Sequence, residues 1–389
     1  MINEKEKDIT IITPDYPAAG HMTYVFVQQL VHAMIDQGVK VTVVAFQSLT
    51  HALVHREKLL PRRSKGVTES GNEYEIYRPY TLSFGNNNPV ERVTDWFNRR
   101  AITSVLKKIK SDVLYAHFWS SALPVYDYAL TNGIPLFVAC GEGDNALEDM
   151  VAEMPKEEQE RLAKACSGVV SVSSENKRKC IDYGLAKADR IGVFPNCVNT
   201  AVFHQMDAAA MREDLGIGSD DFVIGFVGGF GKRKGPDRIA EAIKRITDPK
   251  IKSIFIGKSF KGYEYPFDCP GIVYKGPLDH ELIPQYVNCC DVFVMPTQKE
   301  GCCNAIVEAL ALGLPVISST GAFNDDILNE KNSIRVDADD VDALTEAIKK
   351  LKDSPELRKS MSEYSLSRHA EYGIEGRAQR ILQFIENII

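Results

Sequence analysis

The sequence from Asp291 to Ser319, DVFVMPTQKEGCCNAIVEALALGLPVISS, decides the fold. It opens with a short apolar run, Val292 to Met295, whose β-branched residues and closing proline are typical of a buried strand. Asn304 to Leu312 predicts a helix with Asn304 as its N-cap, an apolar face at helical spacing, and a glycine and a proline that end it. Val316 to Ser319 predicts the next strand. The order strand, loop, helix, strand is that of a parallel βαβ unit.

Two carboxylates lie in this stretch, Glu300 in the loop and Glu308 in the helix. The first helical amides, around residues 303–306, lack intrahelical partners and carry the positive end of the helix dipole, so they favour a phosphate. Glu308 suits the two hydroxyls of a ribose, and Glu300, beyond a strand's carboxyl end, suits sugar hydroxyls. Sugar, diphosphate and ribose are the parts of a nucleotide sugar. The alternative is that both glutamates are solvated surface charges.

The pair of glutamates also resembles a family signature. Glu300, a spacer of seven residues and EALALGLPVIS from Glu308 onward are similar to the motif of the retaining family-four glycosyltransferases. This resemblance covers nearly the whole chain and implies an α/β GT-B fold, with two doubly wound Rossmann-like domains facing across a cleft. It implies that residues 1–200 bind the acceptor, that residues 201–370 bind the nucleotide sugar, and that a C-terminal helix, residues 371–389, packs back on the first domain.

Length and composition agree with two domains. The 389 residues exceed a single ordinary core, and the hydrophobic fraction of 44% and charged fraction of 25% are those of a soluble globular protein. No apolar run is long enough to span a bilayer, and the polar N-terminus does not read as a signal peptide, so we expect a cytoplasmic protein. Nine cysteines without zinc spacing fit reduced thiols. The net charge of -7 argues against a nucleic-acid partner.

The N-terminal half begins with a second βαβ pattern. Asp8 to Thr13 predicts a strand, Tyr24 to Gln37 a helix and Val39 to Ala45 the next strand. Gly20 lies in the loop after the first strand, where the backbone must approach a ligand; the resemblance implies that this ligand is the donor's diphosphate and sugar, whereas the alternative is an ordinary turn. Further strands are predicted at residues 112–117, 134–140 and 169–174.

The acceptor side is less clearly marked. His117 ends a predicted strand and falls where the family has an active-site histidine near the transferred sugar. Relatives often have a histidine before the glycine that follows the next strand, but this chain has Cys140. Glu142, Asp144 and Asn145 are candidates for binding acceptor hydroxyls.

The second half repeats the pattern with FVIGFVGGFGKRKGPDRIAEAIKRI. Phe222 to Val227 predicts a strand and Asp237 to Ile246 a helix, joined by a glycine-rich loop that alone is weak evidence. Arg233 and Lys234 end this loop and can place two positive charges on a departing diphosphate. Lys234 matches the family's loop lysine. Gly229 stands near the place of the usual arginine, and Arg233 is its expected substitute.

The resemblance also implies the remaining donor contacts. The backbone from Lys275 to Leu278 would lie along the edge of the nucleobase. The phosphate would lie against Gly301, Cys302, Cys303, Asn304 and Ala305. Asp325 and Asp326 fall in a loop that faces the donor in relatives, with solvated acids as the alternative. Helices are predicted over Val341 to Lys352 and Glu356 to Ile388.

Basic residues are frequent between His51 and Lys110. They favour a surface that contacts anionic lipid or a lipid-diphosphate acceptor, at the inner face of the membrane, with plain solvated charge as the alternative.

The sequence therefore predicts a retaining transfer of a hexosyl unit from a nucleoside diphosphate sugar to a hydroxyl of a glycan or lipid-linked acceptor. A UDP-sugar is favoured over a GDP-sugar, and surface polysaccharide or lipopolysaccharide synthesis is the expected setting. His117, Arg233, Lys234 and Glu300 are the predicted catalytic residues. No cofactor or metal is expected. A nonhydrolysing UDP-sugar epimerase and a catalytically silent nucleotide-sugar-binding partner remain as alternatives.

Overall fold

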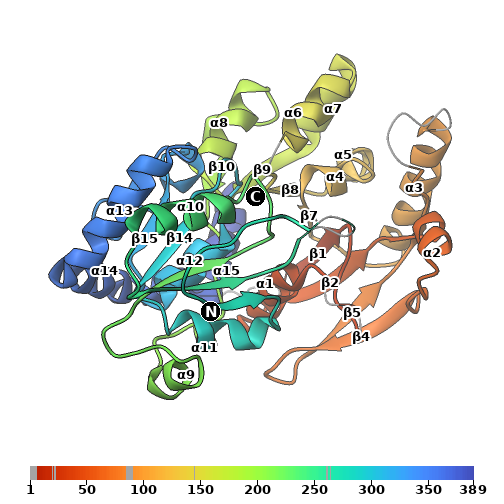
Figure 1. The fold of residues 1–389 in the computed structure, drawn as a ribbon. Coiled ribbons are helices and arrows are strands. Elements are labelled where there is room, and N and C mark those ends of the chain that lie inside the picture. Colours follow the sequence, from red (N-terminus) through yellow and green to blue (C-terminus); the bar gives the residue numbers. More distant parts are fainter. Residues whose placement is uncertain are drawn as a thin grey trace, which may run out of the picture. The chain divides into compact units, whose positions relative to one another are not determined.

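The protein folds into two α/β units (Figure 1). The computed structural model describes residues 7–19, 21, 23–84, 91–143, 145–259, 262 and 264–389, with only the backbone for residues 91 and 92. The first unit comprises Met1–Val172, Asn176–Phe194 and Arg377–Ile389, and the second comprises Ser173–Glu175 and Pro195–Gly376. The main division therefore follows Phe194, slightly before the predicted boundary after residue 200.

The sheet of the first unit has the strand order β10-β9-β8-β7-β1-β2-β5-β4. All neighbours pair in parallel except β4 and β5, which form an antiparallel hairpin. β1 lies between β2 and β7, so the order of the chain reverses beside β1, and open sheets bind ligands at such a point. The strands are β1 (Asp8–Thr13), β2 (Lys40–Ala45), β4 (Arg63–Val67), β5 (Glu73–Tyr77), β7 (Val113–His117), β8 (Leu136–Cys140), β9 (Cys166–Ser171) and β10 (Ile191–Val193), and a small separate sheet pairs β3 (Gln47–Ser48) with β6 (Tyr80–Thr81).

Helices of the first unit include the chain's last one, α15 (Ile374–Ile388). Its Phe384 ring packs against Phe137 and Phe194, with ring centroids 6.1 Å and 5.4 Å apart. The other helices are α1 (Val25–Asp36), α2 (Leu49–His55), α3 (Glu91–Leu106), α4 (Trp119–Ala122), α5 (Tyr126–Asn132), α6 (Ala146–Glu153), α7 (Lys156–Ala165) and α8 (Ser174–Asp182), with a 3-10 turn at Ala188–Arg190.

The sheet of the second unit is parallel throughout, in the order β13-β12-β11-β14-β15-β16. The order reverses between β11 and β14, which are neighbours. Every residue of β14 and β15 is buried, as expected for parallel strands covered on both faces. The strands are β11 (Phe222–Val227), β12 (Ile251–Ile256), β13 (Ile272–Gly276), β14 (Val292–Met295), β15 (Val316–Ser319) and β16 (Ser333–Val336).

The C-terminal part differs from the prediction of one helical stretch over Glu356 to Ile388. The structure breaks it into α14 (Pro355–Ser367), a 3-10 helix (His369–Tyr372) and α15. Gly373 lies at the last break and pairs with Val198, so the two points where the chain passes between units run beside each other. The remaining helices of the second unit are α9 (Ala209–Asp214), α10 (Pro236–Ile246), α11 (Ile283–Val287), α12 (Asn304–Ala311) and α13 (Val341–Asp353), with 3-10 helices at His280–Leu282 and Ala322–Asn324.

Candidate active site

Glu300 is the centre of a polar cluster in the second unit. It lies in the loop between β14 and α12, and its Oε1 accepts from Lys234 Nζ at 2.5 Å and from Arg233 Nη1 at 2.9 Å. Thr297 Oγ1 donates to the same oxygen at 2.8 Å. No described residue donates to the other oxygen, Oε2. The predicted residues Arg233, Lys234 and Glu300 are thus brought together at the carboxyl ends of β11 and β14, where the strand order reverses.

Arg238, which the sequence reasoning missed, holds this cluster in place. It is buried in α10, and its guanidinium donates to the carbonyl oxygens of Lys232 at 2.8 Å and Pro296 at 2.7 Å. One side chain thereby ties the loop after β11 to the end of β14. Gly235 allows this contact because it has φ +74° and any Cβ there would stand 2.4 Å from the Arg238 guanidinium.

The start of α12 has the groups of an anion site, with one correction. Asn304 is the first helical residue and Cys303 is the N-cap, which makes no side-chain capping bond. The Asn304 side chain instead accepts from Asn196 Nδ2 at 2.7 Å, and the same Nδ2 lies 3.1 Å from the Cys302 carbonyl. Gly301, Cys302 and Cys303 are buried, and Ala305 is half-buried. Burial raises the pKa of the Cys303 thiol to about 11, so this thiol stays neutral beside any bound phosphate.

Glu308 has a hydrogen-bond partner, His280, that the sequence does not predict. His280 Nε2 lies 3.2 Å from Glu308 Oε1, and this hydrogen bond raises the pKa of His280. The Phe203 ring also lies against the His280 imidazole, with centroids 5.2 Å apart. The carboxylate predicted to bind a ribose is therefore hydrogen-bonded to a half-exposed histidine.

Two other donor predictions concern backbone positions. Gly229 follows β11, and a Cβ there would meet only the Lys258 carbonyl, at 4.0 Å, so packing does not require glycine. Lys275 lies in β13, and its Nζ donates to the Phe267 carbonyl at 2.6 Å and lies 3.9 Å from the Phe267 ring centroid. Leu278 follows in the next loop, half-buried. Lys275 and Phe267 help to line a hollow of about 440 Å³.

Asp325 and Asp326, in the loop that faces the donor in relatives, both have partners in the structure. Asp325 pairs with Arg335 at 2.7 Å, and Asp326 accepts from the amide and hydroxyl of Ser174, both at 2.6 Å. Ser174 belongs to the second unit, so both contacts lie within that unit.

In the first unit His117 is buried at the end of β7. It stacks on Phe118 with centroids 4.7 Å apart, and Phe26 meets it edge-on at 5.3 Å. Burial, reinforced by the nearby Arg377 charge, lowers the pKa of His117 to about 3. Its Nδ1 is buried and has no hydrogen-bond partner in the described structure. The side chain is therefore a neutral imidazole, suited to a hydrogen bond rather than to carrying charge.

Glu142 lies beyond β8, the strand next to β7. Its Oε1 accepts from the Trp119 amide at 2.8 Å, while no described group bonds to its buried Oε2. Burial raises the pKa of this carboxyl. Asn145 precedes α6 and is exposed. The predicted residues Gly20 and Asp144 lie outside the described residues.

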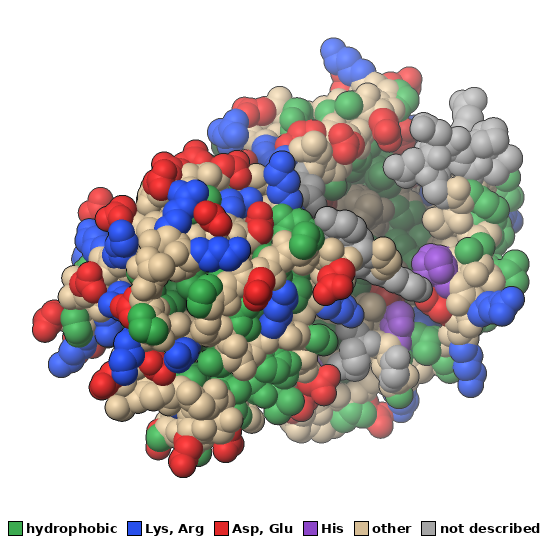
Figure 2. Space-filling view, in the orientation of Figure 1, with side chains coloured by type: hydrophobic (Ala, Val, Ile, Leu, Met, Phe, Trp, Pro, Cys, Tyr) green, Lys and Arg blue, Asp and Glu red, His purple; other side chains and the backbone are tan. Residues whose placement is uncertain are grey.

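Part of the basic stretch is paired with acidic residues. Arg63 and Lys65 in β4 bond to Glu75 and Glu73 across the hairpin, at 2.8 Å and 2.6 Å. Lys110 binds Asp8 at 2.8 Å. Over the second unit, acidic and basic side chains are likewise interspersed on the face seen in Figure 2. Within the described residues, no helix has the length and apolarity needed to cross a bilayer.

Comparison with known proteins covers both halves of the chain. Residues 207–368 match the family model for "Glycosyl transferases group 1", and residues 24–202 match that for "Glycosyltransferase Family 4". A capsular polysaccharide biosynthesis glycosyltransferase of Staphylococcus aureus, CapM, is 31% identical over 220 residues, which are 52% of this chain and 57% of that protein. A UDP-Gal:α-D-GlcNAc-diphosphoundecaprenol α-1,3-galactosyltransferase of Escherichia coli is 25% identical over 283 residues, 69% of this chain and 73% of that protein.

Solved structures confirm the predicted fold class. A sucrose-phosphate synthase from Thermosynechococcus elongatus superposes with a TM-score of 0.76 at 16% identity, over 98% of this chain and 99% of that one. The Anabaena protein HepE, solved with UDP and glucose, gives 0.69 at 13% identity, over 98% and 100%.

Proposed function

Because this chain belongs to the group 1 glycosyltransferases and has their GT-B fold, we propose that it transfers a hexosyl unit from a UDP-sugar to a hydroxyl of a glycan or lipid-linked acceptor. The likeness to the Staphylococcus and Escherichia relatives supports a place in polysaccharide synthesis. HepE, a structural neighbour, was solved with UDP, which favours that nucleotide over GDP.

One observation carries this proposal, the cluster of Lys234, Arg233 and Glu300. Two cations in the loop beyond the carboxyl end of β11 can bind a diphosphate, and the start of α12 supplies helix N-terminal amides in the same unit. Glu300 has a second carboxylate oxygen ready to accept from a sugar hydroxyl. Glu308 would bind the ribose once His280 releases it.

We infer retention at the anomeric carbon. The acceptor oxygen would form its bond to that carbon as the bond to the phosphate oxygen breaks, on the same face, and the leaving phosphate oxygen would take the acceptor's proton. Lys234 and Arg233 would stabilise the negative charge that develops on the leaving group. The neutral His117 would orient a sugar hydroxyl, because an imidazole with a lowered pKa donates or accepts without adding charge.

The test is product formation from matched UDP-, GDP- and ADP-sugars, followed by proton NMR of the anomeric signal. We expect turnover with a UDP-sugar only when an acceptor is present, and an α-linked product from an α-linked donor. Inversion at that carbon refutes the mechanism. A product formed from the donor alone, with an altered sugar still attached to UDP, would instead identify an epimerase.

We also propose that α2 and α3 rest on a membrane surface. Leu53 on α2 and Trp96 on α3 are 81% and 60% exposed, and Arg100 lies 5.6 Å from the Trp96 ring centroid. Exposed apolar side chains beside arginine are typical of helices that lie in the headgroup region, and both helices pack on β6. Sedimentation with phosphatidylglycerol vesicles should fall several-fold for Leu53→Ser with Trp96→Ser. Equal sedimentation of the parent and the variant would refute this surface.

A further inference from the structure

A second cavity lies in the first unit, and none of the predicted site residues is among the residues that line it. It encloses about 580 Å³, within the range of about 300–1,000 Å³ typical of ligand pockets. Phe46, which follows β2, and Ser120, in the helix after β7, both line it. The cavity therefore opens at the carboxyl ends of the two strands that flank β1, where doubly wound sheets bind ligands.

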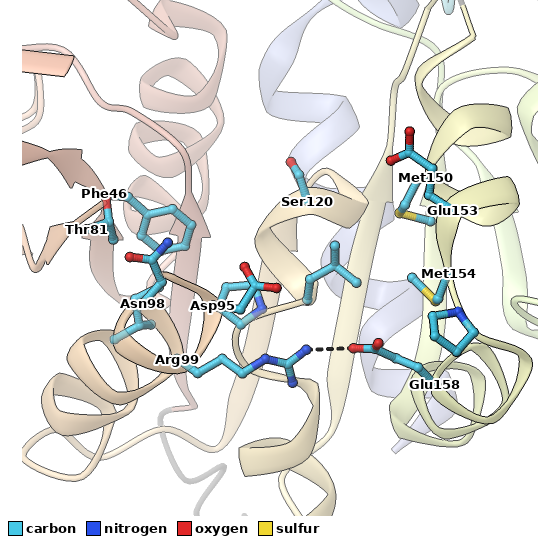
Figure 3. A pocket seen from close by; sticks show the side chains of 14 residues that line it. Phe46, Thr81, Asp95, Asn98, Arg99, Ser120, Met150, Glu153, Met154 and Glu158 are labelled. Carbon is cyan, nitrogen blue, oxygen red and sulfur yellow. Dashed lines mark hydrogen bonds and ion pairs between the residues drawn. The ribbon is translucent and has the colours of Figure 1, made fainter. Parts of the chain in front are cut away.

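The walls combine apolar and acidic groups. Asp95 and Arg99 project from α3 toward Met154 and Glu158 on the opposite wall (Figure 3). Met150 and Leu123 add apolar surface. Such a lining suits a sugar ring, whose C–H face packs on apolar side chains while its hydroxyls donate to carboxylates.

The charge of the cavity can be counted from its ion pairs. Arg99 donates to Asp127 at 3.1 Å and to Glu158 at 2.7 Å, and Arg161 also binds Asp127, so two cations and two carboxylates balance. No described residue donates a hydrogen bond to the two remaining carboxylates, Asp95 and Glu153. Partial burial raises the pKa of Asp95 from its ordinary value, although the nearby Arg99 charge opposes this rise. The cavity thus has an excess of two negative charges.

We propose that this cavity binds a sugar residue of the acceptor and selects neutral or amino sugars against acidic ones. This inference rests on the proposed glycosyl transfer and adds the class of acceptor. An anionic group such as a uronic acid or a diphosphate would face Asp95 and Glu153 and be repelled, whereas hydroxyl and ammonium donors would satisfy both carboxylates. The diphosphate of a lipid-linked acceptor would therefore remain outside the cavity. The other face of α3 carries the exposed Trp96, so the same helix would meet both the glycan and the membrane.

The test uses methyl NMR of the intact protein with labelled methionines. Met150 and Met154 report on the cavity, and Met295, in β14, reports on the donor cluster. The probes are N-acetylglucosamine, glucosamine and glucuronic acid, which share a pyranose ring and differ in charge. We expect glucosamine and N-acetylglucosamine to shift the Met150 and Met154 signals at millimolar concentration and glucuronic acid to leave them in place. In the isosteric variant Asp95→Asn with Glu153→Gln, glucuronic acid should shift them as well.

Each outcome decides between the hypotheses. Unmoved Met150 and Met154 signals with all three sugars, or equal shifts with glucosamine and glucuronic acid in the parent protein, would overturn the cavity assignment. UDP titration followed at Met295 tests the proposed donor site separately. A protein that binds UDP but no sugar in the cavity keeps the proposed function and loses this inference, and the reverse result keeps the cavity and removes the donor site.

Discussion

Replacing Lys234 by alanine tests the donor cluster most directly. Lys234 is 18% exposed and donates to Glu300 at 2.5 Å, so its ammonium is already held where a diphosphate would bind. A hydrogen bond from a charged donor contributes about 1.5–3 kcal/mol. Its loss should weaken UDP binding by about 10- to 150-fold, since each 1.4 kcal/mol is roughly tenfold. The rate of transfer should fall further, by roughly 100- to 1,000-fold, because the leaving group gains charge in the transition state.

The fold should tolerate this change. Glu300 keeps Arg233 and Thr297 as donors, so the loss in unfolding free energy should be about 1 kcal/mol, or roughly 2–4 °C in melting temperature. Titration calorimetry with UDP measures the binding, and circular dichroism measures the stability.

Lys232→Ala is the matched control. It removes the same charge from the same loop, but Lys232 is exposed and its side chain makes no contact with Glu300. It should bind UDP within about twofold of the parent, as expected for an exposed charge. Glu300→Gln should bind UDP at least as tightly as the parent, because it removes a negative charge beside two cations, yet it should lose transfer. Equal weakening by Lys234→Ala and Lys232→Ala would mean that the loop acts only through its overall charge.

Three further outcomes are expected. Glu308 raises the pKa of His280 above 6.5, so at low pH the protonated imidazole competes with the ribose for the Glu308 carboxylate. The affinity for UDP should therefore rise as the pH increases through this pKa, and His280→Ala should remove the pH dependence. The pKa of His117 is about 3 in the folded protein and 6.5 when unfolded, so its contribution to stability is complete above pH 6.5. That contribution is lost as the pH falls toward 3, by up to about 1.4 kcal/mol per pH unit. The melting temperature of His117→Phe should therefore depend less on pH between 6.5 and 3 than that of the parent. Arg238→Met should weaken UDP binding without touching the ligand, because two loop carbonyls lose their donor, and Arg245→Met, on the exposed side of the same helix, should not; calorimetry compares the two variants.

Much of the fold could be predicted because the buried strands are short runs rich in Val, Ile and Phe. β1, β11, β14 and β15 have the predicted bounds, since parallel strands covered on both faces are dominated by such residues. The break between α14 and α15 was missed because Gly373 is a weak local signal, whereas its pairing with Val198 is a contact between residues far apart in the sequence.

The site was predicted where a motif was present and missed where long-range contacts form it. Lys234 and Glu300 stand in recognisable loops, and the structure brings them together. His280 meets Glu308 across 28 positions, and Arg238 reaches Pro296 across 58, so no local pattern indicates either pair. Asn304 is the first residue of α12 rather than its N-cap, and its side chain is bonded to Asn196.

The basic stretch could have been interpreted better from sequence. RSK from residue 63 and EYE from residue 73 bring opposite charges into diagonal contact across neighbouring strands when the two segments form a hairpin, as they do.

The discontinuous make-up of the first unit has a consequence for biosynthesis. Arg377–Ile389 belongs to that unit, and Phe384 covers Phe137 and Phe194. On the ribosome, the residues of the second unit are therefore translated before the first has its full core, although N-terminal domains ordinarily fold first. A nascent chain that lacks α15 would leave the side chains of Phe137 and Phe194 without their Phe384 contact. Chaperones should therefore engage the N-terminal half until α15 has emerged.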